Sequence, residues 1–294
     1  MQGLVVENIS NLYNIEVNDK IYEATARGKF RKDEISPVVG DIVEIDILDE
    51  EKKYAVINDI IKRNVYVKRP KLANISQIIL VVSSENPKPD LLMLDKQLAF
   101  AELLGIKAII VLNKIDLDKQ KQFEKIKKIY TGIGYEVLET QANEKRGLEK
   151  VKEKLKNNIS AFSGNSGVGK STLINSIFNN LITKEGDISQ KNKRGKNTTT
   201  ATKLYKIDTY TYIADTPGFS TFDISEIESK DLANYFVEFK ENVKNCEFVG
   251  CTHIKEENCG IKDAIKAGKI TKDRYYRFCK IYEELRKKEE RKKW

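Results

Sequence analysis

The chain has 294 residues and a hydrophobic fraction of 40%, which is enough for two or three compact domains with cores of their own. No apolar run approaches the roughly 18 residues that cross a bilayer, and the first residues lack a secretory signal pattern, so we expect a cytoplasmic protein. The net charge of +8 divides into −3, +9 and +2 for residues 1–68, 69–222 and 223–294, which favours a polyanionic partner such as RNA. A lysine-rich composition with solvated faces is the alternative explanation of this charge.

Residues 1–68 predict a small β-barrel. Apolar and polar residues alternate in Tyr13–Val17 and again in Val43–Ile47, and residues typical of turns lie between such stretches. About five short strands in so few residues favour a closed barrel, because closure removes exposed edges. We expect an OB-like barrel, with an SH3-like barrel as the alternative.

Residues 69–222 predict a parallel α/β sheet. Ile78–Val82 and Ala108–Leu112 are continuous apolar runs, as expected for strands buried on both faces, and a helical stripe at residues 91–104 separates them. The alternation continues with helices near residues 120–130 and 148–156, and with strands at residues 135–138, 159–163, 202–207 and 211–215.

Residues 223–294 predict helices around a metal site. Leu232, Tyr235, Phe236 and Phe239 have helical spacing, and so have the apolar residues of 275–285. Between these stretches, three cysteines and the single histidine complete the tetrahedral donor set of a structural zinc ion, with redox thiols as the alternative. The proposed ligands are Cys246, Cys251, His253 and Cys259, whereas Cys279 is expected in the core.

A phosphate-binding loop is predicted at residues 164–172. The sequence Gly-Asn-Ser-Gly-Val-Gly-Lys-Ser follows an expected strand and begins a helix, which is the context that this motif requires. Glycines let backbone N–H groups turn toward phosphates, Lys170 neutralises phosphate oxygens, and Ser171 can hold Mg²⁺. The candidate binding residues are Gly164, Asn165, Ser166, Gly167, Val168, Gly169, Lys170, Ser171 and Thr172.

The tetrapeptide Asn113-Lys-Ile-Asp116, which follows the strand at 108–112, predicts GTP rather than ATP. The Asp116 carboxylate can accept hydrogen bonds from guanine N1–H and the 2-amino group, neither of which adenine offers. Alone, the tetrapeptide is as readily a surface turn, but beside a phosphate loop it is specific. Its candidate base-reading residues are Asn113, Lys114 and Asp116.

Two further segments predict the Mg²⁺ and γ-phosphate contacts. Asp215-Thr-Pro-Gly218 follows a predicted strand; in GTPases this aspartate holds Mg²⁺ through water and the glycine amide senses the γ-phosphate. Within Lys196-Asn-Thr-Thr-Thr200, one threonine is the expected second Mg²⁺ ligand, and Thr199 is preferred here.

The order of the motifs predicts a circular permutation. The base-reading motif at 113–116 precedes the phosphate loop at 164–171, whereas ordinary Ras-like GTPases have the reverse order. A sheet tolerates this change if the original termini are close, and the helix near 148–156 would join them. We therefore expect an OB-like barrel at 1–68, a circularly permuted Ras-like α/β P-loop GTPase at 69–222 and a helical zinc-binding domain at 223–294.

The barrel, the permuted motifs, the three threonines and the cysteine–histidine cluster together resemble the ribosome small-subunit-dependent GTPase A family (RsgA, also called YjeQ or YloQ). The resemblance covers the whole chain. It implies a GTPase that acts late in assembly of the 30S subunit, is stimulated by that subunit, and contacts its 16S rRNA in a GTP-dependent way. It also implies GTP or GDP, Mg²⁺ and one structural Zn²⁺, and we expect a monomer.

Two positions differ from familiar GTPase patterns. Asn197 stands where this family commonly has histidine, and an asparagine could orient water but could not act as a base. Phe219 stands where Ras-like enzymes use a water-positioning glutamine. Lys170, Asn197 and Thr199 are the candidate catalytic residues, and the water-activating group stays open. A rival hypothesis is an RNA-binding assembly factor in which the nucleotide acts only as a binding switch.

Overall fold

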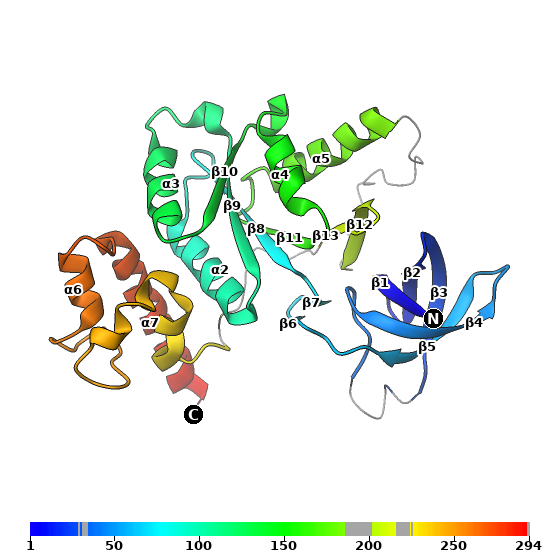
Figure 1. Ribbon diagram of the computed structural model, residues 1–294, viewed down its shortest axis with the longest axis horizontal. Helices are drawn as coiled ribbons and strands as arrows, with labels where there is room; N and C mark the ends of the chain where they lie inside the picture. The colour runs from blue at the N-terminus through cyan, green and yellow to red at the C-terminus, as the bar shows by residue number, and fades with distance from the viewer. Residues whose placement is uncertain (29, 31–34, 186–201, 216–223, 225, 293–294) are drawn as a thin grey trace. The chain divides into compact units, whose positions relative to one another are not determined.

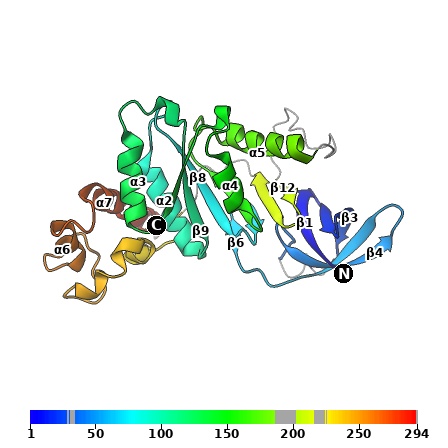
Figure 2. The same cartoon turned by 45° about the horizontal axis from the view of Figure 1, so that its top comes forward.

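The computed structural model describes residues 1–28, 30, 35–185, 202–215, 224 and 226–292, without the side chains of 180–185, 215 and 292. These residues form two compact bodies, each described by itself below. The first comprises residues 1–79, 140–163 and 169–221, and the second comprises residues 80–139, 164–168 and 222–294. Figures 1 and 2 show the elements of each body in chain colours.

The first body begins with a closed five-stranded barrel, which confirms the prediction. Its strands are β1 (Gln2–Ile9), β2 (Leu12–Val17), β3 (Lys20–Ala26), β4 (Ile42–Asp49) and β5 (Tyr54–Ile60). They pair in the order β1-β2-β3-β5-β4, and β4 returns to pair with β1. The β3–β5 pair is parallel and the other four pairs are antiparallel. The alternating apolar residues point inward, so Ile15, Ile45 and Ile57 are buried in the barrel core.

A short antiparallel hairpin, β6 (Tyr66–Lys68) and β7 (Lys71–Ala73), follows the barrel. The first body also holds β11 (Ile159–Ser163), β12 (Lys203–Asp208) and β13 (Thr211–Asp215), in the order β11-β13-β12. β11 and β13 are parallel, whereas β12 and β13 form an antiparallel hairpin. Its helices are η2 (Ala142–Glu144), α4 (Leu148–Leu155) and α5 (Lys170–Glu185).

Strand β12 joins the barrel through backbone pairing and through side-chain charge. β1 pairs with β12 where Glu7 opposes Lys203, and the Lys203 Nζ lies 2.9 Å from a Glu7 carboxylate oxygen. Lys206 forms ion pairs with Glu16 and Asp19 of the barrel. These contacts engage three acidic residues of the negatively charged N-terminal region.

In the second body, β9 (Lys107–Asn113) lies between β8 (Gln77–Ser83) and β10 (Glu136–Thr140). Every residue of β8 is buried, as its continuous apolar run predicted. α2 (Leu91–Leu104), η1 (Ile115–Leu117) and α3 (Gln122–Gly132) connect these strands. Asp90 caps α2 by accepting a hydrogen bond from the Met93 N–H, and Gly105 ends the helix in a left-handed conformation.

The C-terminal part of the second body differs from the prediction in one element. The helix predicted over residues 232–239 is wrong, because this stretch forms two 3₁₀ helices, η4 (Ser229–Tyr235) and η5 (Val237–Phe239). Phe236 between them is extended, with φ of −108°. This break allows both Phe236 and Phe239 to pack on Phe278, with ring centroids 5.1 Å and 4.8 Å away.

The remaining elements of this part are η6 (Val243–Asn245), α6 (Gly260–Lys266) and α7 (Lys272–Lys292). α7 contains the predicted apolar stripe, and Phe278, Ile281 and Leu285 are buried. Among the described residues, no helix combines the length and the apolar character that crossing a bilayer requires. The domain limits at residues 68 and 222 stay predictions.

Candidate functional site

The loop between β11 and α5 has the backbone that a phosphate-binding loop needs. Gly164 and Gly167 have φ of +140° and +82°, values that favour glycine. A Cβ atom on Gly164 would lie 2.2 Å from the backbone oxygen of Val81, so only glycine fits beside β8. Ser166, Gly167, Ser171 and Thr172 are exposed, so a ligand can approach this part of the loop.

Lys170 and Ser171 begin α5, where the helix N-terminus carries partial positive charge. Burial lowers the pKa of Lys170 from its usual value. An anionic phosphate beside this ammonium group would oppose that shift, because it favours the charged form. Lys170 is the residue that the sequence predicted to neutralise phosphate charge.

The predicted base-reading motif contacts the phosphate loop directly. Asn113 ends β9 and is 1% exposed, and its Nδ2 donates to the backbone oxygen of Val168 at 3.0 Å. Lys114 has a left-handed backbone, with φ of +63°, and its Nζ donates to the backbone oxygen of Gly167 at 2.8 Å. Two motifs more than 50 residues apart in the chain are thus hydrogen-bonded side by side. Asp116 lies exposed on η1.

The loop between β8 and α2 supports this arrangement, although it was not among the predicted site segments. The Asn86 carbonyl accepts a second hydrogen bond from Lys114 Nζ at 2.6 Å, and Ser84 Oγ donates to the Lys114 carbonyl at 3.3 Å. Asp90 Oδ2 lies 3.5 Å from the Asn165 side-chain nitrogen. An aspartate directly before the helical stripe at 91–104 is an N-cap signal that could have drawn attention to this loop.

Several predicted site residues lie outside the described residues. These are Asn197, Thr199 and Gly218, together with Phe219, and only the backbone of Asp215 is described, as the last residue of β13. Their assignments to Mg²⁺, γ-phosphate and catalysis stay predictions.

The four predicted metal ligands converge in the second body. The donor atoms of Cys246, Cys251, His253 and Cys259 lie within 4.8 Å of one another. His253 Nδ1 is 3.5 Å from Cys246 Sγ and 3.3 Å from Cys259 Sγ. Zinc bonds of the usual length in a tetrahedral site separate a sulfur from a nitrogen ligand by about 3.5 Å. The donor set therefore fits one zinc ion, with Nδ1 as the imidazole ligand.

The surroundings hold this cluster in a defined shape. His253 has a left-handed backbone, with φ of +64°, and its carbonyl accepts a hydrogen bond from the Tyr275 hydroxyl at 2.7 Å. Burial lowers the pKa of His253, which favours the neutral imidazole that metal ligation requires. Glu256 accepts hydrogen bonds from the backbone and hydroxyl of Thr252. Burial alone would raise the pKa of Glu256, but its hydrogen bonds lower it to about 2.

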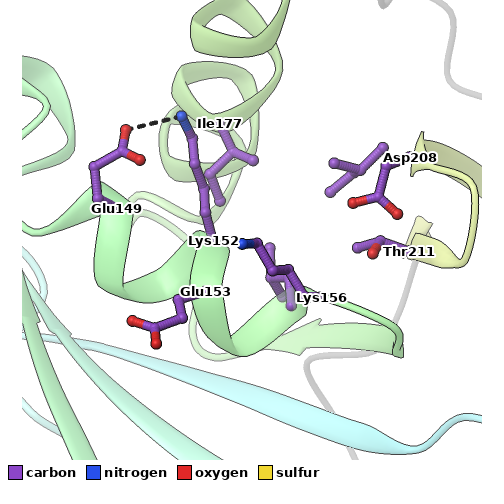
Figure 3. A pocket seen from close by; sticks show the side chains of 9 residues that line it. Glu149, Lys152, Glu153, Lys156, Ile177, Asp208 and Thr211 are labelled. Atoms are coloured by element: carbon purple, nitrogen blue, oxygen red, sulfur yellow. Dashed lines mark hydrogen bonds and ion pairs between the residues drawn. The ribbon is translucent and has the colours of Figure 1, made fainter.

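A separate cavity of about 440 Å³ lies in the first body between α4, α5 and the β12–β13 hairpin (Figure 3). Lys152 and Lys156 line it, but so do Glu149, Glu153 and Asp208, and Lys152 pairs with Glu149 at 3.1 Å. Three carboxylates against two ammonium groups make this cavity unsuitable for a triphosphate. None of the predicted motif residues belongs to its lining.

Comparisons with known proteins agree with this geometry. A family model described as RsgA GTPase matches residues 58–225, and one described as RsgA N-terminal domain matches residues 2–57. A relative from Alkaliphilus metalliredigens, named small ribosomal subunit biogenesis GTPase RsgA, is 39% identical over 97% of this chain and 98% of its own length. A relative of the same name from Caldanaerobacter subterraneus is 38% identical over 99% and 98% of the two chains.

Two solved structures are similar over almost the whole chain. YjeQ from Thermotoga maritima is 35% identical with a TM-score of 0.84, covering 97% of this chain and 98% of its own. YloQ, described as a circularly permuted GTPase, is 29% identical with a TM-score of 0.79, covering 98% and 95%. The predicted barrel and permuted GTPase core are thereby confirmed as a fold. The chain belongs to the RsgA GTPase family, and it is a GTPase.

Proposed function

We propose that the chain binds GTP between its phosphate loop and its base-reading motif and hydrolyses it during maturation of the small ribosomal subunit. One observation carries the nucleotide part of this proposal: Asn113 and Lys114 donate hydrogen bonds to the phosphate-loop backbone at Val168 and Gly167. These hydrogen bonds hold residues 167 and 168 of the phosphate loop beside the motif that contains Asp116. The name shared by the relatives supports the ribosomal part.

The residues have distinct roles in the proposed site. Asp116 accepts hydrogen bonds from the guanine N1–H and 2-amino groups, and the backbone of residues 164–169 surrounds the phosphates. Lys170 neutralises phosphate charge, and Ser171 with Thr199 would hold Mg²⁺, which supplies further charge neutralisation when bound. Asp215 and Gly218 would contact the Mg²⁺ water shell and the γ-phosphate.

Hydrolysis by the chain alone is expected to be slow. Water must attack the γ-phosphorus in line with the leaving GDP, and neither Asn197 nor Phe219 offers a strong base. With intrinsic Ras activity as the scale, we expect unassisted turnover on the order of 10⁻³ s⁻¹ or below. We expect the ribosomal partner to accelerate the reaction.

The cysteine–histidine cluster would hold one structural zinc ion. Four protein ligands leave no open position for a substrate, which supports a structural rather than a hydrolytic role. The zinc would tie the loop at residues 246–259 to the start of α6, which follows Cys259, and so shape the C-terminal module, residues 226–292.

One face of α7 suits contacts with 16S rRNA phosphates. Lys272, Tyr276, Lys280 and Lys287 follow helical spacing and are exposed, and Lys280 Nζ lies 4.6 Å from the centre of the Tyr276 ring. Basic side chains interleaved with an aromatic ring are typical of nucleic-acid surfaces. Not all of the basic residues of this segment contribute, since Arg274 and Arg277 pair with Asp95 inside the body.

The experiment that tests the proposal measures GTP and ATP hydrolysis with and without purified 30S subunits. We expect GTP but not ATP to be hydrolysed, and we expect the rate of GTP hydrolysis to rise strongly when 30S subunits are added. Equal use of ATP would contradict the base-reading role of Asp116. A GTP rate of many per second without 30S would contradict partner stimulation. Binding and release that cycle without hydrolysis would favour the switch-only hypothesis.

A further inference from the structure

A cluster of charges is buried on α2, away from the predicted nucleotide ligands. Asp95 is 0% exposed, and its carboxylate accepts hydrogen bonds from the Tyr130 hydroxyl at 2.6 Å and from Arg277 Nε at 2.5 Å. Arg274 of α7, which is 1% exposed, also donates to Asp95 and reaches Glu238 at 2.5 Å. The Asp95 carboxylate on α2 therefore accepts hydrogen bonds from the guanidinium groups of two arginines on α7.

Burial makes this cluster sensitive to the loss of any member. Burial opposes the charge of Arg274, but attraction to Asp95 and Glu238 outweighs it and raises the pKa of Arg274. Removing one partner of a buried pair is strongly destabilising, because it leaves an uncompensated charge. Two exposed pairs, Lys96–Glu284 and Glu102–Lys240, extend the contact along α2 but are open to solvent.

α2 also lies against the phosphate loop. Met93, Leu94 and Gln97 line a small cavity together with Gly164 and Asn165. At the start of the helix, Asp90 caps the Met93 N–H through one oxygen, and its other oxygen lies 3.5 Å from the Asn165 side chain.

The loop before α2 extends this contact to the base-reading motif. The Asn86 carbonyl accepts a hydrogen bond from Lys114 Nζ at 2.6 Å. α2 thus contacts the phosphate loop directly and contacts Lys114 through the loop that precedes the helix. The buried Asp95 carboxylate of the same helix holds α7.

We propose that Asp95 is a positioning residue through which the C-terminal module sets the affinity of the nucleotide site, with α2 as the rigid connection. The inference rests on the proposed GTP site. Arg274 and Arg277 fix the position of α2, and α2 fixes the loops that hold Lys114 and Asn165. By linkage, any effect of α7 on nucleotide affinity requires an equal effect of nucleotide on α7.

The test measures the affinity of full-length protein for fluorescently labelled GDP. Asp95→Asn keeps the shape of the side chain but removes its charge, and Arg277→Gln removes one guanidinium while leaving Arg274 in place. We expect each to weaken GDP binding, Asp95→Asn by about 5- to 150-fold, the usual range of coupling between sites. Arg277→Lys should restore binding toward the wild-type value. Lys96→Gln, which breaks an exposed α2–α7 pair, should change it by about twofold or less.

A purely structural role for Asp95 would loosen the C-terminal module and leave GDP affinity unchanged, so that result overturns the inference. If Asp95→Asn does not fold, Arg277→Gln decides. Hydrogen exchange of α7 amides in the wild-type protein gives an independent reading, since GDP should slow it, and an unchanged rate also overturns the inference. If the wild-type protein binds no GDP at all, the proposed function itself has failed; if it binds GDP and the variants do so equally well, only the coupling has failed.

Discussion

Replacing Lys114 by methionine tests whether the base-reading motif and the phosphate loop act as one site. The change keeps the aliphatic stem and removes the ammonium group that donates to the carbonyls of Gly167 and Asn86 at 2.8 Å and 2.6 Å. A hydrogen bond to a charged group contributes about 1.5–3 kcal/mol, and the partial exposure of Lys114 reduces this by about half. Two such bonds together then amount to about 1.5–3 kcal/mol, or about 10- to 150-fold in affinity for GDP.

The matched control is Lys121→Met. Lys121 also has a left-handed backbone, with φ of +51°, but its ammonium pairs with Glu124 at 3.8 Å, and both of these side chains are exposed. Titration calorimetry with GDP should show weak binding by the Lys114 variant and unchanged binding by the control. Wild-type affinity in a folded Lys114→Met protein would refute the claim that these bonds hold the nucleotide site together.

Three further predictions concern the base, the metal and the ribosome. Asp116→Asn should weaken GTP binding by at least about 100-fold and favour xanthosine triphosphate, whose 2-oxo group accepts a hydrogen bond from the new amide. Competition binding measures this preference, and an unchanged preference for guanine would contradict the role of Asp116. Cys259→Ser should lower the bound zinc from one ion per chain toward none, whereas Cys279→Ser should retain the ion. Metal analysis of the purified variants measures this difference, and equal zinc in both would contradict the proposed ligand set. Lys280→Glu should weaken 30S binding and reduce the slope of log affinity against log salt by about one; an unaltered slope excludes a phosphate contact there.

The sequence predicted the elements that short-range patterns determine. The apolar runs of β8 and β9 formed buried strands, and the stripe of 91–104 formed α2, because burial on one or both faces fixes these periodicities. The cysteine–histidine cluster was also predictable, since its four candidate ligands lie within 14 residues and their chemistry is distinctive.

The sequence could not predict features that depend on distant partners. Helical spacing in residues 232–239 predicted an α-helix, but packing on Phe278 produced two 3₁₀ helices instead. Arg274 and Arg277 contributed to a basic tail in the charge count, yet their partner Asp95 lies about 180 residues earlier in the chain. The role of Lys114 in joining two loops was hidden for the same reason.

The charged junction between the barrel and β12 affects how the barrel would meet a polyanion. Glu7 and Glu16 have side chains only 17% and 10% exposed, and lysines of β12 pair with both. Counting formal charges therefore overstates the repulsion that an approaching RNA strand would experience. A fragment that ends at residue 68 would lack Lys203 and Lys206, so its carboxylates would lose their counter-charges. Such an isolated barrel would imitate the intact protein poorly in RNA-binding assays.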